Sequence, residues 1–136
     1  MNRIFTADFS QLFEITSYLR EGLFSMGCDE DSVNTAHVIC DEFITNIIKN
    51  AYSGDASGSF SIDDALYQKP LRLSFRKTPD HICVEIADWG RSFNPLEYES
   101  DFSEGGGCGI HIARGLADSI EYRRTACENI VTFCIK

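Results

Sequence analysis

Apolar residues at three- and four-residue spacing predict two helices in the N-terminal part of the chain. The first helix is predicted from Ser10 to about Leu23, because Ser10 is a good N-cap and an apolar stripe follows it. The stripe consists of Leu12, Ile15, Leu19 and Leu23. The second helix is predicted from about Asp29 to Tyr52. Its buried face is expected to hold Ala36, Cys40, Phe43, Ile44, Ile47, Ile48 and Ala51.

Alternating apolar and polar residues predict strands in the rest of the chain. Leu71, Leu73 and Phe75 alternate with polar residues, and a turn at 78–80 leads to a second alternating segment over 82–86. These two segments predict an antiparallel hairpin. Similar patterns predict a short strand over 2–5, a short helix over 110–117, and a second hairpin over 120–124 and 130–135. Residues 53–69 and 88–108 contain many glycine and polar residues and are predicted to be loops.

The order of these elements predicts the fold class. Consecutive hairpins favour a mixed, mostly antiparallel sheet, and helices that cover one of its faces complete a two-layer α/β sandwich. A doubly wound parallel sheet would need strands that alternate with helices. The chain has 136 residues, no repeat and no linker, so residues 1–136 are expected to form a single domain.

Composition and charge exclude several classes of protein. The formal charge is −9, and an acidic surface repels a phosphate backbone, so direct nucleic-acid binding is not expected. The first 25 residues lack a continuous apolar run, and no segment approaches the roughly 18 apolar residues of a membrane span. We therefore expect neither a secretory signal nor membrane contact. The six cysteines form no C-x-x-C pair and are interpreted as reduced, structural thiols of a cytoplasmic protein.

Three polar residues follow one line along the second predicted helix. Glu42, Asn46 and Asn50 are spaced by four residues, which places them on one edge of the apolar stripe. A carboxylate can accept a proton, and an amide oxygen is a suitable ligand for Mg²⁺. The simpler interpretation is the solvent-facing side of an amphipathic helix. Because asparagine is a poor helix former, two asparagines in mid-helix strengthen the functional interpretation, and both interpretations stay open on this pattern alone.

Two glycine-bearing segments follow later in the chain. Asp88 and Gly90 come directly after a predicted strand, where the carboxylate can accept a hydrogen bond from an adenine amine and the glycine lets a flat base approach. The alternative is an ordinary Asp-x-Gly turn. A second segment precedes the helix predicted from Ile110, and it reads Gly105-Gly106-Gly107-Cys108-Gly109. Glycines at a helix N-terminus expose N–H groups to anions such as phosphate, although a flexible linker would have a similar composition.

In this order and spacing, the three segments resemble the motifs of the superfamily that includes gyrase, the Hsp90 chaperones, histidine kinases and MutL. Glu42-x-x-x-Asn46-x-x-x-Asn50-Ala51-Tyr52 resembles its N box, Asp88-x-Gly90 its first glycine box, and the run from Gly105 to Ile110 its second. Within that superfamily, the chain is most similar to the anti-sigma factor serine/threonine kinases. This similarity rests on the Asn-Ala-Tyr end of the N box, on Phe93-Asn94-Pro95, and on the Gly-Ile-x-Ile-x-Arg-x-Leu-Ala-Asp run over 109–118.

The resemblance implies a Bergerat-type ATP-binding fold, with ATP and Mg²⁺ as cofactors. Glu42 would orient or deprotonate the attacking serine hydroxyl, Asn46 would ligate Mg²⁺, and Lys49 and Asn50 would lie near the phosphates. Asp88 would read the adenine amine, and Gly90 would permit the base to approach. Residues 94–108 would form a mobile lid. Further nucleotide contacts are implied for Phe93, Gly105, Gly106, Gly107, Cys108, Gly109 and Ile110.

The resemblance also implies a function and partners. The protein would be a cytoplasmic anti-sigma factor that holds a sigma factor inactive and phosphorylates a serine or threonine of a STAS-type anti-anti-sigma protein. It would form a homodimer through its N-terminal strand and helix, where Phe5, Phe9 and Phe13 supply apolar surface. No direct contact with nucleic acid or membrane is implied.

Two features depart from the pattern of the family and keep alternatives open. Many members have a second glycine in the first glycine box, where this chain has Arg91 and Ser92. Some members have an arginine just ahead of the last glycines, where this chain has Glu104 and where only Arg91 and Arg114 are near in sequence. One alternative is a non-catalytic, nucleotide-gated binding switch of the same fold. Another is an isolated catalytic domain of a histidine kinase, although the chain has no room for a phospho-accepting helical hairpin.

Overall fold

Five strands form one sheet in the computed structural model of the chain, which describes residues 2–52, 69–92, 94, 96 and 113–136. The strands are β1 (Asn2–Thr6), β2 (Pro70–Lys77), β3 (Ile82–Asp88), β4 (Ser119–Arg124) and β5 (Asn129–Ile135). They lie side by side in the order β1-β2-β3-β5-β4, and every neighbouring pair is antiparallel. Both predicted hairpins and the predicted N-terminal strand are confirmed. The described strands are antiparallel throughout, in agreement with the mostly antiparallel sheet that the sequence predicted.

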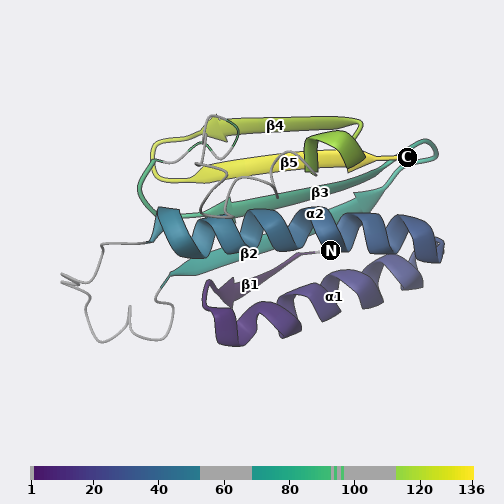
Figure 1. Cartoon of the computed structure of the whole chain (residues 1–136), viewed down its shortest axis with the longest axis horizontal. Coiled ribbons are helices and arrows are strands. Elements are labelled where there is room, and N and C mark those ends of the chain that lie inside the picture. Colours follow the sequence, from purple (N-terminus) through teal and green to yellow (C-terminus); the bar gives the residue numbers. More distant parts are fainter. Residues whose placement is uncertain (1, 53–68, 93, 95, 97–112) are drawn as a thin grey trace, which may run out of the picture.

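The helices cover one face of this sheet (Figure 1). They are the 3₁₀ turn η1 (Phe9–Gln11), α1 (Leu12–Ser25), α2 (Glu30–Asn46) and the π-helical turn η2 (Ile47–Ala51). Strand residues on the covered face are fully buried, and they include Leu71, Leu73, Val84, Ile86 and Phe133. Alternate residues on the other face are mostly polar, as at Arg72, Ser74, Glu85 and Thr132, with Ala87 and Ile130 among the exceptions. This division into one apolar and one polar face confirms the two-layer α/β sandwich.

The start of the first helix differs from the prediction. Ser10 does not cap α1, because it lies inside η1, where its N–H donates to Asp8 Oδ1 at 2.8 Å. Asp8 therefore caps a short 3₁₀ turn, and the α-helix begins only at Leu12. The helix α2 begins directly after Asp29, where its start was predicted, and Asp29 caps it, with its Oδ1 accepting from the N–H of Ser32 at 2.7 Å.

Cysteine pairing is a second correction. Cys83 of β3 and Cys134 of β5 form a disulfide, although all six cysteines were expected to be reduced. The two residues are direct partners in the β3–β5 register, and their Cα atoms are 4.1 Å apart. In a sheet, direct partners point to the same face, which brings their side chains within bonding reach. Cys28 and Cys40 are buried free thiols, as predicted, and burial raises the pKa of each.

Several predicted segments lie wholly or partly outside the described residues. They are the loop over 53–69 except for its last residue, most of the loop over 88–108, and the first three residues of the helix predicted over 110–117. The described part of that helix, residues 113–116, is helical as predicted. Ala113 is fully buried, so this short helix contributes to the core.

Candidate functional site

The polar line on the second helix is present, and its asparagines are tied to the main chain. The Nδ2 atom of Asn46 donates to the carbonyl oxygen of Glu42 at 2.8 Å, and the Nδ2 atom of Asn50 donates to that of Asn46 at 3.1 Å. Side-chain donors of this kind compete with the helical ladder. The α-helix ends at Asn46, and the π-helical turn η2 follows, a geometry that is frequent at functional sites.

Asn46 has the properties of a metal ligand. Its side chain is only 5% exposed, and its Nδ2 is already used. Among the described residues, none donates a hydrogen bond to its Oδ1. A buried amide oxygen without a donor is costly unless a ligand supplies the missing interaction, and an amide oxygen suits a hard cation such as Mg²⁺. The residue therefore fits the role that was predicted for it.

Glu42 lies one turn before Asn46 and is partly buried. Desolvation raises the pKa of its carboxyl group, the neighbouring Asp41 raises it further, and Lys49 opposes the shift. A carboxylate with a raised pKa is a better proton acceptor near neutral pH than an ordinary surface glutamate. Lys49 itself is exposed, so its charge is available to a ligand beside this helix.

Asp88 ends β3 on the helix-covered face of the sheet and is 2% exposed. Its Oδ1 accepts two hydrogen bonds, from the N–H of Gly90 and from Nδ2 of Asn129, both at 2.9 Å. Burial raises the pKa of Asp88, while these two hydrogen bonds and the charge of Arg124 oppose the rise. No described residue donates to Oδ2, so this buried carboxylate has one oxygen left for a ligand.

Gly90 is the point where the two predicted motifs meet. A Cβ atom added at Gly90 would lie 2.4 Å from the carbonyl oxygen of Ala51 and 2.9 Å from its Cβ, so only glycine fits here. The N–H of Arg91 donates to the same Ala51 oxygen at 3.0 Å, and Arg91 Nε donates to Asn50 O at 2.8 Å. The structure therefore gives Gly90 a role in joining the turn to the end of η2. The predicted approach of a base to Gly90 stays a prediction.

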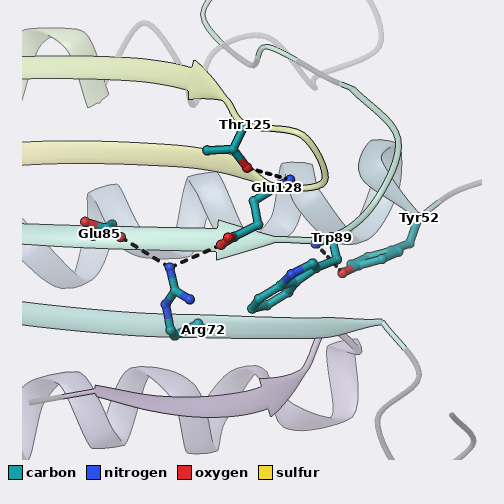
Figure 2. A network of polar contacts seen from close by, with 6 residues as sticks. All are labelled: Tyr52, Arg72, Glu85, Trp89, Thr125 and Glu128. Carbon is teal, nitrogen blue, oxygen red and sulfur yellow. Dashed lines mark hydrogen bonds and ion pairs between the residues drawn. The ribbon is translucent and has the colours of Figure 1, made fainter.

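Tyr52 makes a second joint between the helix end and the sheet (Figure 2). Its hydroxyl donates to Pro70 O at 2.5 Å and accepts from the N–H of Trp89 at 2.9 Å. On the helix-free side, the Arg72 guanidinium lies 5.5 Å from the centre of the Trp89 ring and pairs with Glu128 at 3.2 Å. The end of the N box and the first glycine box are thus one continuous, hydrogen-bonded unit.

Three arginines at or after the first glycine box donate to main-chain oxygens. Arg91 donates to Asn50, as described above, Arg124 Nη1 donates to Gly90 O at 2.9 Å, and Arg114 Nη2 donates to Leu96 O. Arg91 and Arg114 were the cations that the sequence offered for the phosphates, and Arg124 was not considered. Phe93 and the whole second glycine box, Gly105 to Ile110, lie outside the described residues.

Two further residues of the site were missed at the sequence level, Asn129 and Tyr122. Asn129 is 2% exposed and bonded to Asp88, and it accepts from the Tyr122 hydroxyl at 2.7 Å. A signal existed in the alternation of the last strand, where Asn129 falls in the same stripe as Val131, Phe133 and Ile135. A single amide in an otherwise apolar stripe indicates a buried polar contact.

Solved structures of the same architecture identify the class of fold. The RsbU and RsbW domains of Rv1364c from Mycobacterium tuberculosis superpose with a TM-score of 0.62 at 15% identity, over 100% of this chain and 32% of that one. A chain of the SiaB-SiaC complex from Pseudomonas aeruginosa gives 0.66 at 13% identity, over 99% and 88%. A histidine kinase domain from Erythrobacter litoralis gives 0.54 at 19% identity, over 93% and 59%. The fold is therefore that of histidine kinase-like ATPases.

The sequence agrees with this class. Residues 5–135 match the histidine kinase-like ATPase domain family, and the chain belongs to that family. It is also similar to a curated relative, the serine-protein kinase RsbW of Oceanobacillus iheyensis, with 29% identity over 108 residues. The matched segment is 71% of this chain and 61% of that relative. No helix among the described residues is long and apolar enough to cross a membrane.

Proposed function

We propose that this domain binds ATP with Mg²⁺ and acts as an anti-sigma factor kinase. It phosphorylates a serine or threonine of a STAS-type anti-anti-sigma protein and holds a sigma factor inactive. The observation that carries the proposal is the joint at Gly90. Around Gly90, the buried carboxylate of Asp88, whose Oδ2 accepts from no described residue, is joined to the end of the helix that presents Glu42 and Asn46.

The adenine end of the nucleotide is read by Asp88. Its Oδ1 is occupied by Gly90 and Asn129, so Oδ2 accepts a hydrogen bond from the exocyclic amine of the base. A buried, charge-assisted hydrogen bond contributes about 1.5–3 kcal/mol. The same bond forms with ATP and with ADP, because both carry adenine.

The phosphate end lies along the polar line of the helix. Asn46 Oδ1 is the protein ligand of Mg²⁺, and the ion neutralises phosphate charge when it is bound. Lys49 is exposed beside this line and supplies positive charge. Glu42, with its raised pKa, accepts the proton of the attacking hydroxyl as the phosphoryl group leaves ATP for that oxygen. The second glycine box, Gly105 to Ile110, and Phe93 complete the phosphate and base contacts in this proposal.

The proposed partners come from the relatives. The 29% identical relative is named a serine-protein kinase, and the chain of 0.66 TM-score belongs to a two-protein complex. A cytoplasmic partner switch with a sigma factor and an antagonist protein is consistent with both. A homodimer is proposed as the assembly that grips the sigma factor.

The test is phosphate transfer to a co-encoded antagonist by wild type and by Glu42→Gln. The amide is nearly isosteric but accepts no proton, so transfer is expected to fall about 10²–10⁴-fold while ATP affinity and sigma-factor retention persist. Glu21→Gln is the matched control, since it makes the same change at an exposed glutamate of α1 that the proposal does not use. Equal transfer by wild type and Glu42→Gln would overturn the role of Glu42.

A binding switch without chemistry is the second candidate. The observation in its favour is that Arg91, Arg114 and Arg124 donate to main-chain oxygens, which leaves none of these three unengaged for the γ-phosphate. Wild type that retains a sigma factor only with ATP present, but transfers no phosphate to any antagonist, would establish this candidate in place of the kinase.

A further inference from the structure

Asn129 uses its whole side-chain amide in contacts around Asp88. It begins β5 and is 2% exposed. Its Nδ2 donates to Asp88 Oδ1 at 2.9 Å and to the carbonyl oxygen of Arg91 at 2.7 Å. Its Oδ1 accepts from the hydroxyl of Tyr122 on β4 at 2.7 Å. One buried amide therefore contacts the strand end, the turn after it, and the neighbouring strand.

The orientation of this amide follows from its neighbours. A carboxylate oxygen and a carbonyl oxygen lie on one side, and both can only accept, so the NH₂ group must face them. A flipped amide would place Oδ1 against two acceptors, so Arg91 O and Asn129 Oδ1 would lose their donors and Asp88 Oδ1 would keep only the N–H of Gly90. The Tyr122 hydroxyl must then donate to Oδ1, which fixes the direction of that hydroxyl as well.

The amide determines which oxygen of Asp88 is available. Oδ1 is saturated by the donors of Asn129 and Gly90, and the carboxylate cannot rotate without losing both. We propose that Asn129, oriented by Tyr122, is the positioning residue that directs Oδ2 of an ionised Asp88 toward the base and so makes the site select adenine over guanine. This inference rests on the nucleotide-binding function proposed above.

The selectivity follows from the two base edges. Adenine carries an amine at position 6, which donates to a carboxylate, whereas guanine carries a carbonyl oxygen there, which a carboxylate repels. A protonated Asp88 would instead donate to that carbonyl, and the discrimination would be lost. Burial favours the protonated form, while Asn129, Gly90 and the charge of Arg124 oppose it. Arg124 is the charged side chain that acts on Asp88 within the described part of the chain.

The first experiment needs no nucleotide. The side-chain carboxyl carbon of Asp88 is titrated by NMR in the unliganded wild type, Asn129→Leu and Tyr122→Phe, with Asp88→Asn to assign the signal. Loss of the amide is expected to raise the titration midpoint by about one to two pH units, the equivalent of one charge-assisted hydrogen bond. Tyr122→Phe should shift it in the same direction by less. Tyr18→Phe, which removes a hydroxyl elsewhere in the molecule, should leave it unchanged.

The second experiment measures selectivity. Calorimetry of ADP and GDP at pH 7.5 should show the ratio of their affinities falling at least about tenfold in Asn129→Leu. Unchanged midpoints together with an unchanged ratio would overturn the inference. If Asn129→Leu does not fold, the same two measurements on Tyr122→Phe decide the question, because this variant keeps the aromatic ring and removes only the hydroxyl oxygen. A wild type that binds neither nucleotide would refute the proposed function and the selectivity, while the carboxyl titration still decides whether Asn129 holds Asp88 ionised.

Discussion

Burial disfavours the charged form of Asp88 more than its neighbours favour it. Burial raises its pKa in the folded protein above that of the unfolded chain. With this sign, the contribution of Asp88 to stability is fully present below the unfolded pKa and is lost as pH rises through the folded pKa. At neutral pH, the ionised carboxylate therefore lowers the stability of the unliganded domain, and a bound donor relieves that effect. A buried carboxylate with this effect on stability is better explained by ligand binding than by folding.

Replacing Asp88 by Asn should separate these two effects. Affinity for ATP and for ADP is expected to fall by a similar factor, about 10- to 100-fold, because the hydrogen bond to the shared base is lost. The unliganded variant should unfold at the same or a higher temperature than wild type at pH 8, with the advantage shrinking toward pH 4. Titration calorimetry and thermal unfolding measure the two quantities. Unchanged affinity would remove Asp88 from the site.

A substitution at Gly90 tests the close contact between the turn after β3 and the end of η2. A methyl group there would overlap the carbonyl of Ala51, so Gly90→Ala is expected to lower the free energy of unfolding by about 1–3 kcal/mol and to weaken nucleotide binding. Gly115→Ala is the matched control. It has nothing within 4 Å and lies in the helical segment 113–116, so it should raise stability by up to about 1 kcal/mol. Denaturant unfolding with both variants compares them, and equal effects would contradict the close approach.

At the scale of secondary-structure elements, the residues that cap the two long helices can be compared. Asp29 caps the long helix α2, whereas Ser10, which the sequence favoured as a cap, lies inside η1 and does not cap α1. Asp29→Ala should therefore lower the free energy of unfolding by about 1 kcal/mol, and Ser10→Ala should change it little. Chemical denaturation of the two variants gives the comparison. A larger loss for Ser10→Ala would mean that the predicted start of the first helix was right after all.

Local patterns predicted the elements well, and side-chain contacts between elements explain what they missed. Periodicity located both helices and both hairpins, because those patterns reflect burial on one face. It did not locate the π-helical turn η2, which follows asparagines bonded back to the carbonyls of Glu42 and Asn46. The Cys83–Cys134 pairing depends on the β3–β5 register, and the contact of Asn129 with Asp88 joins residues 41 positions apart. Residue spacing in the sequence gives neither the register of two strands nor a side-chain contact between distant segments.

At the scale of the whole molecule, apolar side chains remain exposed near the N-terminus. Phe13 is 80% exposed, Phe9 is 53% exposed, and Ile4 on the edge strand β1 is 52% exposed. Phe5, expected in the same surface, is instead 6% exposed and packs edge-on against Tyr18 at 5.6 Å. Exposed aromatic groups beside β1, the outermost strand at one end of the described sheet, are consistent with the proposed homodimer.

Phe13→Asp should weaken that dimer. A charge at an apolar interface is costly to desolvate, so the monomer fraction at micromolar concentration should rise by about tenfold or more. Val38→Asp, at a position 43% exposed on the other helix, should leave the oligomeric state unchanged. Light scattering with size exclusion measures both. Wild type that is monomeric at every concentration would contradict the dimer itself.

The strand order has a consequence for synthesis of the protein. β5 is inserted between β3 and β4, so one edge of β3 has no partner until residues 129–135 have been made. At ordinary rates of translation, this interval lasts roughly a few seconds. During that time an apolar strand edge is open to other nascent chains. Slower, cooler expression and chaperone capacity should therefore affect the soluble yield of this domain more than they affect a domain whose central strands are consecutive in sequence.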